Sequence, residues 1–468
     1  MLVFPKLNEI KQHSLTINEF KGLDKRPNAA FNSLSDTSGI SSKYFPALTT
    51  RRGRRIVFGV HGEEEITGIF SFDKAYLTVS CAGSTKLYYG DDFSSLSCIY
   101  TADADDLESS MFCVFDGKLC LFNLKATDSS QNAMASSITA IDVPTRFSAP
   151  VFNDITAYKN RVFGCRRKQI RACAADDVYE WDYSKNPEVA GDRAYFKSVE
   201  AKSDFIACTT YKDHALFFTE NEAFELYGND VDSFDVYKIA DFGCVNRFAV
   251  CEVGGVLYFL SKDGVVRYDG SSISLISDAI CDTSTDDSKA VLGGGGSTLY
   301  VKIAGEKNEC IYTYNVEKKL WARDGLFKGN CSAFYNGKVY FSDGYYVYKM
   351  DVSYEDEPTD NDGTYFYWEA VTQDIHLDSP RKKLASKLNI YIKRAIAGRV
   401  EVAISYDNGG FETLGSFFTE GGKTICIPLP HTRSEKIKIK VYGWGEAQID
   451  YISFSYTLGG ECRWQQSQ

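Results

Sequence analysis

The chain has 468 residues, with 52 lysine and arginine against 63 aspartate and glutamate side chains, and its formal net charge is −11. This acidic balance argues against a general nucleic-acid-binding protein, whose surface would be basic. No apolar run reaches the roughly 18 residues of a transmembrane helix, and the first residues lack the apolar segment of a secretory signal. Aromatic residues make up 14% of the chain, and with helical periodicity scarce this composition predicts an all-β fold without membrane insertion.

Residues 1–52 are predicted to form an extended N-terminal arm. Gly, Ser, Asn and Pro dominate this segment, and single apolar residues separate them, so a core of its own is not expected. Ordering such a segment costs conformational entropy, so it should bury its apolar residues against a surface. That surface is expected to be partly the rim of the following domain and partly an adjacent subunit. The predicted assembly contacts are Phe20, Leu23, Arg26, Tyr44, Arg51, Arg52, Arg54 and Arg55.

The arginines at the end of the arm have two interpretations. They are either the solvated start of a strand, with the acidic run at residues 63–65 nearby, or a contact with DNA or a neighbouring subunit. The first interpretation is favoured because charge runs on protein surfaces are usually solvated.

Residues 53–353 are predicted to form a β-propeller. The clearest stretch, residues 204–277, shows strands of four to seven residues separated by Gly-Gly, Asp-Gly or other short polar turns. Similar four-stranded patterns recur, which favours about seven blades, although six or eight are compatible because weak blades are easily miscounted. The expected modules are residues 56–101, 110–142, 154–200, 204–239, 248–276, 290–323 and 331–352.

The C-terminal part is predicted to be a separate β-sandwich. Residues 354–363 are acidic and contain Pro and Gly, as expected of a linker, and residues 364–468 contain six clear strand patterns with apolar and polar residues in alternation. This size and alternation favour a jelly-roll or immunoglobulin-like sandwich. The stretch 405–411 resembles the Asp-box turn of sialidases, but a hairpin turn explains it better.

Motifs that carry chemistry are missing. The sequence has no HExxH, Walker A or GxSxG motif, and the glycine run at residues 293–296 lacks the lysine of a phosphate-binding loop. Its 14 cysteines include no CxxC pair, and its five histidines are not paired at ligand spacing. We therefore expect a protein that is not an enzyme, with no cofactor, no bound metal and reduced, mostly buried cysteines.

Several stretches resemble phage and prophage virion propellers. They are Phe20-x-Gly-Leu-Asp-x-Arg with Tyr44-Phe-Pro-x-Leu-x-Thr-Arg51, residues 239–244 with 255–270, and the tail residues 427–430, 441–449 and 456–461. The resemblance implies a non-enzymatic bacteriophage tail component, similar to tail-nozzle or packaged-DNA-stabilisation proteins. It further implies a ring oligomer, with a hexamer favoured, that contacts portal, adaptor or other tail proteins around the DNA path. Non-specific contact with passing DNA, location in the virion tail and assembly in the cytoplasm of the host bacterium follow from the same resemblance.

The alternative function is a propeller that binds or cleaves glycans and takes part in host-surface recognition. In this hypothesis Trp181, Trp321 or Trp444 would stack on sugars. It is less favoured because tryptophans within strands usually belong to the core.

Overall fold

The protein is all-β, as predicted. The computed structural model contains forty β-strands and no α-helix within the residues that it describes, and no helix there could cross a membrane. The chain divides into unit 1, Met1–Gly53, Thr313–Gly325 and Val352–Gln468, and unit 2, Arg54–Tyr312 and Leu326–Asp351. The described residues are 12–81, 84–103, 111–123, 132–137, 145–185, 190–280, 289–304, 309–352, 360, 365–376, 382–396, 399–418 and 420–458.

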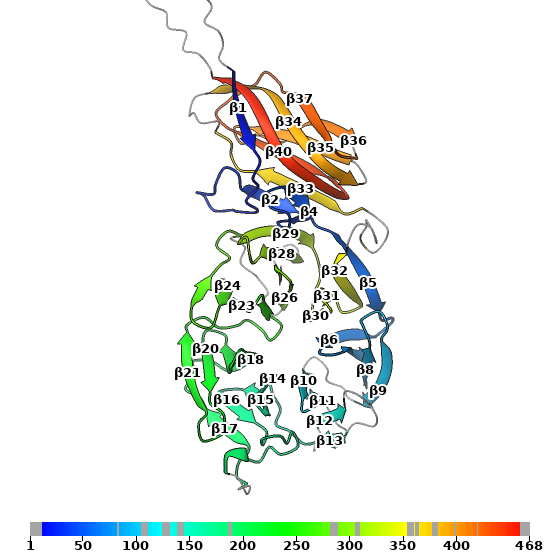
Figure 1. Ribbon diagram of the computed structural model, residues 1–468, viewed down its shortest axis with the longest axis vertical. Helices are drawn as coiled ribbons and strands as arrows, with labels where there is room; N and C mark the ends of the chain where they lie inside the picture. Colours follow the sequence, from blue (N-terminus) through cyan, green and yellow to red (C-terminus); the bar gives the residue numbers. More distant parts are fainter. Residues whose placement is uncertain are drawn as a thin grey trace, which may run out of the picture. The chain divides into compact units, whose positions relative to one another are not determined.

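Seven four-stranded sheets follow one another along the described chain (Figure 1). The first is β6 (Glu65–Ser71), β7 (Ala75–Cys81), β8 (Ser84–Gly90) and β9 (Ser97–Asp103). The second is β10 (Met111–Phe115), β11 (Lys118–Phe122), β12 (Ala133–Ser137) and β13 (Thr145–Phe147). The third is β14 (Asp154–Tyr158), β15 (Arg161–Arg166), β16 (Gln169–Ala172) and β17 (Tyr195–Ser198), with a short 3₁₀ turn at Ala190–Asp192. The fourth is β18 (Phe205–Tyr211), β19 (His214–Thr219), β20 (Ala223–Tyr227) and β21 (Asp235–Ala240).

The fifth and sixth sheets are also built from four consecutive strands, whereas the seventh takes its fourth strand from earlier in the chain. The fifth is β22 (Val250–Val253), β23 (Val256–Ser261), β24 (Gly264–Tyr268) and β25 (Ile273–Leu275). The sixth is β26 (Val291–Gly295), β27 (Thr298–Ala304), β28 (Glu309–Asn315) and β29 (Leu320–Leu326). The seventh is β30 (Cys331–Tyr335), β31 (Lys338–Ser342) and β32 (Tyr346–Val352), and its fourth strand is β5 (Gly53–Gly59). The sequence analysis placed residues 56–59 in the first module, whereas the structure pairs them with the seventh sheet.

Local sequence explains the hairpins that open these sheets. Asp116-Gly117 and Asn336-Gly337 have positive φ at each residue, with values of 47° and 64° and of 47° and 74°. Two such residues are the requirement of a type I′ turn, whose twist matches that of the strands in a two-residue hairpin, and Asn, Asp and Gly adopt that conformation most readily.

The sheets of unit 2 surround a common centre (Figure 1), with the first strand of each sheet innermost. Tyrosines at the ends of these strands bond to the next sheet: the hydroxyl of Tyr158 donates to the backbone oxygen of Asp213 at 2.6 Å, and that of Tyr211 to Gly255 at 2.8 Å. Tyr335 of the seventh sheet repeats the pattern with the carbonyl of Asp73 in the first sheet, at 3.0 Å. Bonds of this kind therefore link the seventh sheet to the first as well as sheets that are neighbours along the chain.

Asparagines add a second set of bonds between neighbouring sheets. Asn153, just before β14, donates to the carbonyl of Phe205 at 2.7 Å, and Asn330, just before β30, donates to that of Ile66 at 2.8 Å. Asn330 thus joins the last sheet to the first, as Tyr335 does. These side chains satisfy backbone oxygens that the inner ends of the sheets would otherwise bury without partners.

Unit 1 contains two larger sheets that share one hydrophobic core. One has the order β2 (Leu34–Ser38), β33 (Tyr367–Thr372), β39 (Ile437–Trp444), β35 (Arg399–Tyr406) and β36 (Glu412–Phe418). The other has the order β3 (Ile40–Ser41), β4 (Leu48–Thr50), β40 (Glu446–Leu458), β34 (Lys383–Ile396) and β37 (Lys423–Pro428), with β1 (Gln12–Ile17) on β40 and β38 (Arg433–Ser434) on β34. Core residues from both sheets include Trp368, Leu388, Val402, Ile439 and Phe454.

The boundaries of the units differ from the predicted domains. The segment predicted as a separate arm contributes strands to unit 1, since β1 and β4 pair with β40 and β2 pairs with β33. Residues 313–325, expected in the propeller, also belong to unit 1. These assignments depend on pairing between distant parts of the chain, which local patterns do not encode. The predicted linker, residues 354–363, lies outside the described residues except for position 360.

Candidate interaction site

Four of the eight predicted assembly contacts are buried within the chain. Phe20 and Leu23 have exposed fractions of 4% and 2%. The guanidinium of Arg51 lies 3.1 Å from the carboxylate of Asp324 and 4.1 Å from the ring centre of Phe366. Arg54 is stacked on Phe327 at 4.8 Å. These four side chains pack inside their own unit, and an assembly contact at these residues stays a prediction.

The other four predicted contacts reach the surface. Arg26 donates two hydrogen bonds to Asp24, at 2.9 and 2.8 Å, and the pKa of that carboxyl is lowered mainly by these bonds. Tyr44 is 45% exposed, and the guanidinium of Arg52 lies 5.7 Å from its ring centre. Arg55 is exposed. The structure therefore brings Tyr44 and Arg52 together, and an assembly role for these four residues stays a prediction.

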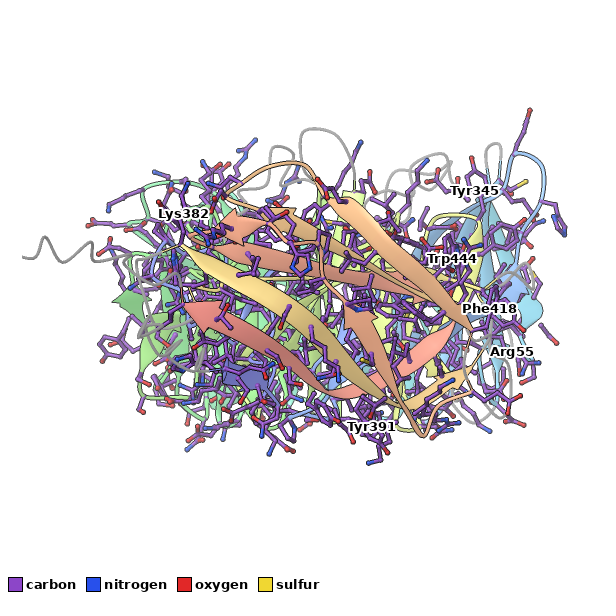
Figure 2. All side chains as sticks on the ribbon, turned by 90° about the horizontal axis from the view of Figure 1, so that it is seen from above. Arg55, Tyr345, Lys382, Tyr391, Phe418 and Trp444 are labelled. Atoms are coloured by element: carbon purple, nitrogen blue, oxygen red, sulfur yellow. The ribbon has the colours of Figure 1, made fainter. Side chains whose placement is uncertain are left out.

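The described surface of unit 1 carries a row of side chains that crosses four strands, which we call the aromatic row. Tyr367 of β33 lies opposite Trp444 of β39, and Arg399 of β35 lies opposite Phe418 of β36. Val400 lies opposite Gly443, so Arg399 and Trp444 are next to each other across β35 and β39. Figure 2 shows Trp444 and Phe418 at the same end of the sheet.

The aromatic row is open to solvent. Tyr367, Trp444 and Phe418 are 39%, 37% and 78% exposed. The rings of Tyr367 and Trp444 meet edge to face at 5.5 Å, and the guanidinium of Arg399 lies 5.4 Å from the centre of the Trp444 ring. Such contacts hold the rings of Tyr367 and Trp444 in fixed orientations, so the row combines exposed aromatic rings with a guanidinium.

Charged groups on the same sheet hold the aromatic row in place. The hydroxyl of Tyr367 donates to the carboxylate of Glu369 at 2.8 Å, and the ammonium of Lys440 lies 2.6 Å from that carboxylate. Burial would raise the pKa of Glu369, but the bonds from Lys440 and Tyr367 outweigh it and hold the pKa below its usual value. Arg399 is paired with Glu401 at 2.5 Å. The row can therefore bind a partner, but it carries no acid and base pair that is free to move protons.

The sequence analysis found one member of the aromatic row. Trp444 was a candidate for stacking on sugars, whereas the other two candidates pack internally: Trp321 is 2% exposed, and Trp181 lies against Phe122 and Phe152 at 5.9 and 5.2 Å. Arg399 and Phe418 were missed because they join the row only through the strand register. The stretch 412–418 shows no regular alternation that would have predicted β36.

A second polar cluster lies inside unit 2. Nε2 of His214 is 3.3 Å from the carboxylate of Glu225, which accepts hydrogen bonds from the hydroxyls of Tyr227 and Tyr268. His214, Glu225 and Tyr268 are at most 5% exposed. Burial and the bond to Glu225 raise the pKa of Tyr227 to about 12. The cluster joins β19, β20 and β24, and its burial gives it a structural role.

The cysteines form no disulfide in the part of the chain that the structure describes. Twelve of them lie there, and no three His, Cys, Asp or Glu side chains of these residues gather as metal ligands would. Cys113 and Cys120 are opposite each other on β10 and β11, and both are buried. The pKa of Cys113 is raised by its hydrogen bond with Cys120 and by burial, so the thiol stays protonated and unreactive.

No protein-family profile and no curated protein matches the sequence. Among solved structures, the chain is similar to an exo-β-1,3-galactanase from Phanerochaete chrysosporium bound to galactose, with 9% identity, a TM-score of 0.29 and coverage of 87% of this chain and 100% of that chain. A protein described as exported from Bacteroides fragilis has 9% identity, a TM-score of 0.32 and coverage of 53% of this chain and 91% of its own. At these TM-scores neither likeness identifies an activity.

Proposed function

We propose that the protein is a non-enzymatic structural subunit of a bacteriophage tail, which forms a ring of identical copies, with a hexamer favoured. In this proposal unit 2 is a seven-bladed β-propeller and unit 1 is a β-sandwich. The sequence resemblance to virion propellers supports the tail assignment. The bonds of Tyr335 and Asn330 from the seventh sheet to the first support a closed, rigid propeller.

The aromatic row is the observation that carries the assembly role. Phe418 is 78% exposed beside two half-exposed aromatic rings and a guanidinium. Apolar area in water costs roughly 25 cal/mol per Å², so this surface gains free energy when a partner covers it. Tyr, Trp, Phe and Arg are also the side chains that are enriched at protein interfaces and their energetic centres. We propose that the partner is a second copy of this chain.

The remaining partners follow from the resemblance. Portal, adaptor or other tail proteins would contact the ring in the virion, after assembly in the cytoplasm of the host bacterium. The net charge of −11 suits a ring around the DNA path, because a negative wall does not retain a passing polyanion, and contact with DNA would be non-specific.

Two substitutions test the aromatic row. Phe418→Ser and Trp444→Ala remove most of its exposed apolar surface, and we expect the purified full-length protein to fold normally but to lose its oligomer in mass photometry. Stability should change little, because both side chains face solvent.

The matched control is Tyr237→Ser, which removes an aromatic side chain that is 56% exposed on β21. This variant should assemble like the unchanged protein. Unaltered assembly of the Phe418→Ser and Trp444→Ala variants would show that the row is not the subunit interface.

Glycan binding remains the second candidate, and one observation favours it. Trp444 is the exposed member of the three tryptophans considered, and Tyr367 flanks it at 5.5 Å, a pair on which a sugar ring can stack. If this candidate is right, a glycan array will show binding that Trp444→Ala abolishes, while the protein stays monomeric with or without the substitution.

A further inference from the structure

A hollow in the third sheet of unit 2 is lined by arginines. It has a volume of about 250 Å³, and its lining comes from the β15–β16 hairpin and from the segment before β14. We call it the arginine hollow. Its lining residues are Pro150, Val151, Phe152, Arg166, Arg167, Gln169 and Arg171.

The arginine hollow is cationic in an acidic protein. Its lining contains three arginines and no carboxylate. Within the described residues, Arg171 donates to the side-chain oxygen of Gln169 at 3.0 Å and lies 5.2 Å from the ring centre of Phe196. Neither contact neutralises its charge. Arg166 and Arg167 are exposed and form no ion pair with another described residue. Three arginines thus line one hollow without an ion pair to a described carboxylate, in a chain of net charge −11.

The apolar wall of the hollow is fixed in place. The backbone of Phe152 exchanges two hydrogen bonds with the side-chain amide of Asn123, at 3.1 and 2.7 Å. A Cβ on Gly164 would lie 2.4 Å from the Phe152 ring, so only glycine at this position of β15 lets the ring pack there. Phe152 is 3% exposed. The fold therefore holds this wall of the hollow in one position.

We propose that the arginine hollow binds a small molecule in which a carboxylate or phosphate is attached to one ring-sized group. Guanidinium groups match carboxylate and phosphate oxygens with paired hydrogen bonds. The Gln169 oxygen already accepts from Arg171, which leaves its amide hydrogens to donate to a ligand oxygen. Val151 and Pro150 offer an apolar side to the ring of the ligand.

Size and charge exclude a longer polyanion as the ligand we infer. A volume of about 250 Å³ lies just below the range of pockets for drug-sized ligands, roughly 300–1,000 Å³, so one ring and its anionic group fill it. A nucleic acid needs a basic surface that follows its backbone over several nucleotides, which the overall acidic charge of this chain opposes.

The proposal is tested by calorimetric titration of the full-length protein with glucuronate, glucose 6-phosphate and inorganic phosphate, with neutral glucose as the ligand control. We expect at least one of the two ring-bearing anions to bind and glucose not to bind. Tighter binding of glucuronate would identify the carboxylate as the preferred group. Tighter binding of glucose 6-phosphate would identify the phosphate as the preferred group. Binding of none of these anions at millimolar concentration would overturn the proposal, as would tighter binding of a single-stranded oligonucleotide than of both ring-bearing anions.

Two variants locate the binding site. Arg167 has a φ of 52°, and because asparagine adopts this conformation more readily, Arg167→Asn should keep the fold while removing a guanidinium. Arg171→Gln removes a second one. Each should weaken binding by about tenfold or more, the loss of one hydrogen bond between charged groups.

The matched control is Lys159→Asn. Lys159 has a φ of 54° in the β14–β15 hairpin of the same sheet and does not line the hollow. This variant makes the same change of charge and backbone preference elsewhere, so anion affinity should not change. Equal loss in the control and in the hollow variants would mean that net charge alone determines binding, and it would refute a site at this hairpin.

Discussion

Arg51 shows how a residue expected at an interface can instead stabilise its own unit. Its guanidinium contacts the carboxylates of Asp324 and Asp360 and the face of Phe366, and its side chain is 10% exposed. A charge at this depth is tolerated because two carboxylates and an aromatic face replace water around it. The run of arginines therefore combines buried and surface roles that the sequence does not distinguish.

Arg51→Ala should destabilise unit 1 by about 3–5 kcal/mol, because it removes one partner of a buried ion pair. Arg52→Ala, whose side chain is half-buried at the surface beside Tyr44, should cost about 1 kcal/mol or less. Urea unfolding of the two variants measures the difference. Equal effects would contradict the assignment of Arg51 to the interior.

Asp154 gives unit 2 a pH-dependent stability. Its carboxylate accepts a hydrogen bond from the backbone nitrogen of Cys208 at 2.8 Å, and burial raises its pKa to about 7, although nearby Arg247 opposes the shift. The folded state therefore holds this proton more tightly than the unfolded state, whose carboxyl has a pKa of about 3.9.

The contribution of Asp154 to stability should be fully present at low pH and be lost as the pH rises from about 4 to about 7. Above pH 7 it should not change further. Asp154→Asn stays neutral, so its unfolding free energy should lack this decline, which urea titrations at several pH values will show. An unchanged pH profile in the variant would contradict a raised pKa at Asp154.

At the scale of elements, tyrosines at the ends of inner strands link neighbouring sheets in the same way. Tyr335 joins the seventh sheet to the first and Tyr158 joins the third to the fourth, each through bonds to backbone oxygens. Tyr335→Phe and Tyr158→Phe should each cost about 1 kcal/mol, because each loses a buried hydrogen bond. Urea unfolding measures both effects. A much smaller effect of Tyr335→Phe would show that the bond between the seventh and first sheets contributes little to the free energy of unfolding.

Elements with a local signal could be predicted from the sequence. The hairpins at Asp116-Gly117 and Asn336-Gly337 and the alternating strands of residues 204–276 carry their own turn and pairing preferences. The partner of β5 could not be predicted, because it is fixed by pairing with β32, far away in the sequence. Strands β1, β2 and β4 were missed for the same reason, since the sheets that they complete lie at the other end of the chain.

The candidate site was predictable only in part. Trp444 could be predicted as a candidate because tryptophan is large and rare. Its exposure could not, because strand pairing determines which face of β39 is exposed to solvent. Arg399 and Phe418 enter the row through pairing of β35 with β36. The arginine hollow had a local signal in the basic run at residues 166–168 followed by Arg171, yet its apolar wall comes from the chain before β14.

At the scale of the whole molecule, each of the two units is held together by contacts of its own. Unit 2 is tied together by bonds between successive sheets, and the first and last parts of the chain are built into one core in unit 1. Among the described residues, the aromatic row places exposed aromatic rings and a guanidinium side by side, and the proposal of assembly rests on it.

The oligomeric state of the purified full-length protein tests this account most directly. Mass photometry combined with negative-stain electron microscopy should show closed rings, with a hexamer of six times the 52.3 kDa chain mass as the favoured species. A protein that stays monomeric at micromolar concentration, and whose particles show no rings, would contradict the account.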